Sequence, residues 1–141
     1  MIIDTDVLIW YLRGNEHAKQ IVESSLPFSI SVVTYIELVQ GMKNRDEYRR
    51  FQKQLQLWNT EIIHIDSDIS SRATFYIQEY TLSHALWLAD ALIAATVIQK
   101  GEILLTANDK HYKFIPNRGS FKSRTSFERT TLYCGICVRF Q

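Results

Sequence analysis

The sequence begins MIIDTDVLIWYL (residues 1–12), and this stretch holds the pattern that decides the fold. Met1–Ile3 is a short run of apolar residues without polar alternation, which is typical of a strand buried on both faces of a parallel sheet. Asp4 follows it directly, and Asp6–Leu12 is predicted to be a short helix that Gly14 would end. A strand followed at once by a helix favours an α/β fold.

Strands and helices continue to alternate along the chain. Further strands are predicted at residues 28–32, 61–65 and 103–105. Further helices are predicted at residues 17–25, 34–42 with Thr34 as the N-cap, 48–58, 67–80 and 88–99. This order predicts an α/β sandwich around a mostly parallel sheet.

Length and composition are those of one globular domain. The 141 residues are 46% hydrophobic and 22% charged, which excludes a disordered chain and suffices for one core. No apolar run could span a bilayer, and the N-terminus lacks the basic start of a signal peptide, so we expect a cytoplasmic location without membrane contact. The net charge of +1 does not by itself indicate a nucleic-acid-binding protein.

Three acids stand in apolar surroundings. Asp4 ends the first predicted strand, Glu37 lies near the start of a helix, and Asp90 lies in the most apolar helix. Ligands of such sheets bind at the carboxyl ends of the strands, so Asp4 and residues 106–109 are expected at one crevice. Converging carboxylates repel one another unless a cation lies between them, and Mg²⁺ or Mn²⁺ suits oxygen ligands.

Each acid also has an explanation without chemistry. Asp4 could cap the helix that follows it, Glu37 could lie on a solvated helix face, and the helix dipole could favour Asp90 in a first turn. Structural acids outnumber catalytic ones, so these are the preferred explanations for any single acid. Only the joint placement of the three favours a metal site.

Four segments carry a family resemblance: IIDTDVLI (residues 2–9), SVVTYIEL (31–38), LADALIAAT (88–96) and LLTANDKHY (104–112). In this order they resemble PIN-domain endoribonucleases, most closely the VapC-type toxins of type II toxin–antitoxin systems. The resemblance covers about residues 1–118. It implies a PIN-like three-layer α/β/α sandwich with a central, mostly parallel sheet.

The resemblance also implies a set of site residues. Three acids match the family's metal-binding and catalytic positions: Asp4, Glu37 and Asp90. Three neighbours are further candidate metal ligands: Asp6, Asn108 and Asp109. The family's fourth acidic position falls at Asn108, which leaves the second of two possible metal ions open.

The implied activity is the hydrolysis of RNA phosphodiester bonds with Mg²⁺ as the cofactor, or Mn²⁺ as the alternative. Hydroxyl groups of Thr5 and Thr106 are candidates for orienting the phosphate. Besides RNA, the implied partners are a cognate antitoxin and a second copy in a homodimer. The antitoxin is expected to lay an apolar helix against Trp10 and its neighbours and an Arg or Lys against Asp4 and Asp90.

A set of basic residues lies on and before the helix predicted at 48–58: Lys43, Arg45, Arg49, Arg50 and Lys53. They could guide the backbone of an RNA strand. A solvated helix face is the more common reason for such a pattern. Both interpretations stay open from the sequence.

The resemblance ends after Asn117, so the predicted nuclease domain is 1–117. Residues 118–141 form a basic tail without helix or strand periodicity, which is a candidate for disorder. A missing last strand would expose a sheet edge. Cys134 and Cys137 in this tail are interpreted as incidental thiols, because no second pair completes a zinc site.

Two other functions stay open. One is a PIN-like protein-binding module whose catalytic site is disabled by Asn108. The other is a haloacid-dehalogenase-like phosphatase, whose nucleophile motif resembles Asp4–Leu8, although Glu37 and Asp90 would then be unexplained. Metal-dependent cleavage of single-stranded RNA that stops in EDTA would separate the nuclease from both.

Overall fold

The computed structural model of the chain describes residues 1–116 and 121–123. Its strands are β1 (Ile2–Ile3), β2 (Ser29–Ser31), β3 (Glu61–Ile63), β4 (Leu104–Thr106) and β5 (Phe121–Ser123). Its helices are α1 (Thr5–Leu12), α2 (Glu16–Ser24), α3 (Val32–Gln40), α4 (Arg45–Leu57), α5 (Ser67–His84), α6 (Leu88–Lys100) and the 3₁₀ helix η1 (Asp109–His111). None of the helices in these ranges is long and apolar enough to cross a membrane.

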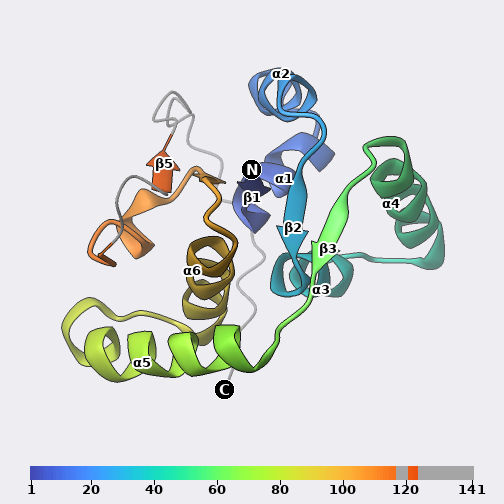
Figure 1. Cartoon of the computed structure of the whole chain (residues 1–141). Coiled ribbons are helices and arrows are strands. Elements are labelled where there is room, and N and C mark those ends of the chain that lie inside the picture. Colours follow the sequence, from blue (N-terminus) through green and yellow to red (C-terminus); the bar gives the residue numbers. More distant parts are fainter. Residues whose placement is uncertain (117–120, 124–141) are drawn as a thin grey trace.

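All five strands are parallel and lie in the order β3-β2-β1-β4-β5 (Figure 1). β1 lies in the middle, where Ile2 pairs with Ser29 of β2 on one side and with Leu104 of β4 on the other. The order of the strands therefore reverses at β1. In open parallel sheets, ligands bind in the crevice at the carboxyl ends of the strands beside such a reversal.

Helices cover both faces of the sheet. Successive residues of a strand face opposite sides, so Ile2 and Leu104 pack with α5 and α6, whereas Ile3 and Leu105 pack with α1, α2 and α4. Figure 1 shows the strands between these two groups of helices. The predicted three-layer α/β/α sandwich is confirmed, with a sheet that is parallel throughout the described residues.

The start of α3 differs from the prediction. Ser31 caps the helix instead of Thr34, because the Ser31 hydroxyl accepts the N–H of Val33 at 3.2 Å. β2 therefore runs into α3 without a loop. Thr34 lies inside the helix, where its buried hydroxyl is 3.2 Å from that of Thr5. This start places Glu37 in the second turn of α3, opposite the start of α1.

α6 is the predicted apolar helix, and it ends at Gly101 with a left-handed φ of 63°. Residues 93–97 are fully buried, as a helix that is apolar on all sides requires. Its first turn is different, because Leu88 is 64% exposed and the preceding Trp87 is 70% exposed. The helix thus extends beyond the core at its N-terminal end, where Asp90 lies.

Periodicity predicts no strand after Asn117, and the structure corrects this. Phe121–Ser123 form β5, which pairs in parallel with β4 and covers the sheet edge that was expected to be bare. A three-residue edge strand is too short to show an alternating pattern in the sequence. Residues 124–141, with both cysteines, lie outside the described residues. The domain boundary at residue 117 stays a prediction.

We expect a chain truncated after Asn117 to fold but to be less stable than a chain truncated after Ser123. The shorter chain loses β5, which leaves the outer backbone groups of β4 without strand partners. A loss of ~1 kcal/mol would lower the melting temperature by roughly 4 °C in a domain of this size. Thermal unfolding followed by circular dichroism compares the two chains. Equal melting temperatures would show that β5 contributes nothing to stability.

Candidate active site

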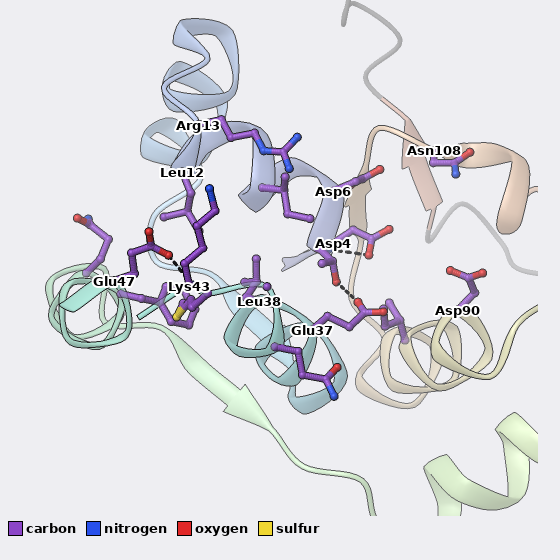
Figure 2. A pocket seen from close by; sticks show the side chains of 18 of the residues that line it. Asp4, Asp6, Leu12, Arg13, Glu37, Leu38, Lys43, Glu47, Asp90 and Asn108 are labelled. Carbon is purple, nitrogen blue, oxygen red and sulfur yellow. Dashed lines mark hydrogen bonds between the residues drawn. The ribbon is translucent and has the colours of Figure 1, made fainter. Parts of the chain in front are cut away.

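A groove with a cavity volume of about 1080 Å³ lies among α1, α3, α4 and α6. This is slightly above the range for small-molecule sites, roughly 300–1,000 Å³. Five acids line it: Asp4, Asp6, Glu37 and Asp90 at one end, and Glu47 on α4. Three cations line it as well: Arg13, Lys43 and Arg50. Figure 2 shows Asp4, Glu37 and Asp90 together on the right of the groove, and Lys43 on the left beyond Leu38.

Asp4 lies between the end of β1 and the start of α1. Its Oδ1 accepts the N–H of Thr5 at 2.8 Å, so the predicted role as helix cap is confirmed. Its Oδ2 accepts the hydroxyl of Tyr112 at 3.0 Å. The residue is only 6% exposed, and this burial raises the pKa of the Asp4 carboxyl, with a smaller contribution from the charge of Asp90. Asp4 is thus both a cap and a buried acid.

Asp6 connects α1 to the segment after β4. Its Oδ2 accepts the N–H of Ala107 at 3.0 Å and lies 3.4 Å from the hydroxyl of Thr106. Burial, together with the neighbouring charge of Asp4, raises the pKa of Asp6 to about 7. Asp6 therefore both lines the groove and holds α1 against the end of β4.

Glu37 reaches the same acids from α3. The hydroxyl of Thr5 donates to Oε2 of Glu37, which fixes this side chain beside the start of α1. Burial raises the pKa of Glu37, and the charges of Asp4 and Asp90 add to the shift. The alternative of a fully solvated helix face does not hold, because the residue is half-buried and lines the groove.

Asp90 joins the group from the first turn of α6. Nδ1 of His111 lies 2.9 Å from its Oδ2, and the hydroxyl of Tyr112 lies 3.4 Å from its Oδ1. Burial raises the pKa of Asp90, and the facing His111 opposes that shift. Since Tyr112 also donates to Asp4, one phenol group stands between two acids that come from different elements.

Sequence analysis missed both His111 and Tyr112. The only available signal was their position at the end of the fourth matching segment, residues 104–112. Tyr112 is 1% exposed, and its burial and the surrounding carboxylates hold its pKa well above the usual range. Its hydroxyl therefore stays protonated and supplies a hydrogen bond to the acids.

The residues predicted after β4 are only partly at the groove. Asn108 lines it, whereas Thr106 and Asp109 do not. The Thr106 hydroxyl is buried beside Asp6 and accepts the N–H of Asn108 at 3.0 Å. The backbone carbonyl of Asp109 accepts the N–H of Tyr112 at 3.0 Å within the η1 turn. Thr106 thus stabilises Asp6 and the backbone of Asn108 without lining the groove. The Asp109 side chain does not line the groove either.

The donor set suits a hard divalent cation in its chemistry, because carboxylate oxygens are the ligands that Mg²⁺ and Mn²⁺ prefer. Burial raises the pKa of Asp4, Glu37 and Asp90, so a bound cation would favour their charged forms. Within residues 1–116 and 121–123, however, no three His, Cys, Asp or Glu side chains are close enough to enclose a metal ion. The residues fit such an ion only if their side chains move closer together when it binds.

The family model described as PIN domain matches residues 1–115 of the chain. The chain is also similar to a solved structure of a toxin–antitoxin complex from Klebsiella pneumoniae, with 31% identity, a TM-score of 0.72, and coverage of 86% of this chain and 94% of that one. VapBC-1 from nontypeable Haemophilus influenzae has 17% identity and a TM-score of 0.70, with coverage of 86% and 96%. FitAcB from Neisseria gonorrhoeae has 23% identity and a TM-score of 0.63, with coverage of 79% and 90%. A comparison with curated proteins found no significant match.

We expect the metal-free protein to become less stable as the pH rises from about 5 to about 8. A pKa that is raised in the folded state means that the folded chain keeps a proton which the unfolded chain has released. The resulting stabilisation is complete below the ordinary pKa of 3.8 and is lost as the pH rises through the folded value, about 7 for Asp6. Thermal unfolding in EDTA measures this loss, and Asp6→Asn should reduce it. A melting temperature that increases steadily over this range would contradict the raised pKa values.

Proposed function

The chain belongs to the PIN domain family, and on that premise we propose that it is a VapC-type toxin that cleaves RNA as a metal-dependent endoribonuclease. The observation that carries the proposal is the convergence of four acids on one groove: Asp4, Asp6, Glu37 and Asp90. Membership of this family leaves the phosphatase alternative without support. The substrate, the cofactor and the site residues are parts of the proposal.

Asp4, Glu37 and Asp90 would hold Mg²⁺, or Mn²⁺ in its place, with Asp6 and Asn108 as further candidate ligands. When bound, such an ion supplies positive charge for the phosphate and activates water for hydrolysis. Asp4 is 6% exposed, so water screens its carboxylate little, which strengthens its attraction for a cation.

The neighbouring side chains would position the acids. The hydroxyl of Thr5 orients Glu37, and the hydroxyl of Tyr112 holds Asp4 close to Asp90. Thr5 lines the groove and could also donate to a phosphate oxygen if Glu37 released it. Thr106 is buried and supports Asp6 instead, so the proposed phosphate-orienting role passes to Thr5 alone.

The same groove suits a segment of an antitoxin, and the similarity to chains from toxin–antitoxin complexes supports such a partner. Ile9 and Leu12 of α1, with Leu38 of α3, give the groove an apolar lining. An Arg or Lys of the partner, placed against the acids, would replace the metal as counter-charge. Trp10 does not line the groove, so Leu12 is the better probe of this contact. A homodimer remains a prediction from the resemblance.

Asp4→Asn is expected to abolish RNA cleavage while leaving stability equal or higher. The side-chain oxygen of the asparagine can keep the helix cap, and its amide N–H can donate to the Tyr112 hydroxyl, which then donates to Asp90. The substitution removes one charge from a group of repelling carboxylates. Cleavage of single-stranded RNA is measured in Mg²⁺ and in EDTA, together with thermal unfolding. Asp68→Asn, at an exposed position in α5, is the matched control.

Two results would count against this assignment. An Asp4→Asn variant that cuts RNA at the normal rate would show that Asp4 is not a metal ligand. A wild-type protein that does not cut RNA in Mg²⁺ or Mn²⁺, yet binds its antitoxin, would favour the binding-module alternative.

Leu12→Ala is expected to weaken antitoxin binding by about tenfold while sparing RNA cleavage, since it removes apolar contact area worth roughly 1.5 kcal/mol. Leu12 is 46% exposed in the free chain and lines the groove. Leu57→Ala, at a position that is 79% exposed and outside the groove, is the control. The binding of purified antitoxin and the rate of cleavage are measured for each variant. Unchanged binding would remove the end of α1 from the interface.

A further inference from the structure

We propose that Arg13, Lys43 and Arg50 form a second, cationic end of the groove that binds a backbone phosphate of the RNA strand some distance from the cleaved bond. This cationic end would hold the strand while the acids act on it. The inference rests on the proposed function in that the ligand is taken to be RNA. Its residues are separate from the acids and their hydrogen-bonding partners.

The three cations come from three different places in the fold and line one groove. Arg13 is the C-cap of α1, Lys43 lies in the link between α3 and α4, and Arg50 lies on α4. On α4, the residues that line the groove recur at helical spacing: Glu47, Arg50, Phe51 and Gln54. Figure 2 shows Lys43 and Arg13 on the side of the groove away from Asp90.

The length of α1 separates the two ends of the groove. Asp4 is the N-cap and Arg13 the C-cap of this helix, which has 8 residues. At a rise of 1.5 Å per residue, the helix is about 12 Å long. This length separates the backbone of Arg13 from that of Asp4, so the cationic end suits a different phosphate from the one that the acids would hold. It lies within reach of a neighbouring phosphate of the same strand.

The charges at this end are available to an anion. Among the described residues, none of the three cations forms an ion pair, whereas Lys19 pairs with Glu16 and Arg49 with Asp46. Glu47 is the acid that lines this end, and its Oε2 accepts the backbone N–H of Lys43 at 2.9 Å. Three positive charges thus face the groove with one negative charge beside them.

The structure separates basic residues that lie close together in the sequence. Lys43 and Arg50 line the groove, whereas Arg45, Arg49 and Lys53 do not. Contact with RNA in the groove is therefore proposed only for Lys43 and Arg50 of this set. The interpretation as a solvated helix face is kept for Arg45, Arg49 and Lys53. Arg13 was not in the predicted set, because it is far from α4 in the sequence and joins the others only in the folded chain.

RNA explains this end better than a partner protein does. An RNA strand carries a negative charge at every nucleotide, so a strand held at the acids brings phosphates along the groove. A protein segment that neutralises Asp4 and Asp90 must instead bring positive charge into the same groove. The apolar side chains of Ile9 and Met42 offer surfaces for bases.

The test compares two double variants with the same decrease in charge. Lys43→Gln with Arg50→Gln removes two cations of the groove, and Arg49→Gln with Lys53→Gln removes two from the same region outside it. KM and kcat are measured for a labelled single-stranded RNA oligonucleotide in Mg²⁺ over a series of salt concentrations. We expect the first pair to raise KM by about tenfold with little change in kcat, and to reduce the salt slope by about 0.7 for each phosphate that the variant no longer binds. The control pair should change neither, and Lys43→Arg with Arg50→Lys should restore the wild-type KM.

Three results would overturn the proposal. One is a KM and a salt slope that do not change in the Lys43→Gln, Arg50→Gln variant, although the wild type cuts RNA. This result would leave the proposed function intact. Another is an equal rise of KM in the control pair, which would reduce the effect to overall charge. The third is weaker binding of an acidic antitoxin peptide with no change in the KM for RNA, which would assign the cationic end to the protein partner. A wild type that does not cut RNA would instead refute the proposed function, and the RNA ligand with it.

Discussion

The mutual repulsion of buried carboxylates at one edge of the sheet is the constraint on which the rest of the site depends. Asp4 and Asp6 flank the start of α1, and Glu37 and Asp90 approach from two other helices. Burial raises the pKa of each of the four. In the metal-free chain, hydrogen-bond donors offset part of this cost, among them the hydroxyl of Tyr112 between two of the acids. A fold that accepts this arrangement gives up stability for a strong attraction to cations.

The central position of β1 makes this arrangement possible. Both neighbours of β1 are parallel to it, so the carboxyl ends of β1, β2 and β4 lie at the same edge. α3 follows β2 without a loop and brings Glu37 to that edge, while the exposed first turn of α6 brings Asp90. The groove continues from the acids past apolar side chains to Lys43. One surface can thus combine an acidic end, an apolar middle and a cationic end.

The elements of the fold could be predicted from the sequence, since their signals are local. The apolar run before Asp4 predicted a buried central strand, and the all-round apolar pattern of residues 88–99 predicted a buried helix. Local signals failed where two of them competed. Ser31 and Thr34 can both cap a helix, and only the end of β2 decides between them. β5 had no signal, because three residues at a sheet edge are held by pairing with β4 and carry no pattern of their own.

For the site, the sequence by itself determined which acids stand in apolar surroundings, and it predicted that Asp4, Glu37 and Asp90 act together. Only the tertiary structure decided what surrounds them. Tyr112 meets Asp4 because it follows η1 after β4, the strand that pairs with β1. Arg13 meets the cations near α4 because α1 runs along the groove. The physical reason is that burial, charge repulsion and hydrogen bonding depend on distances in space. Segments far apart along the chain set those distances only when both faces of the sheet have been packed.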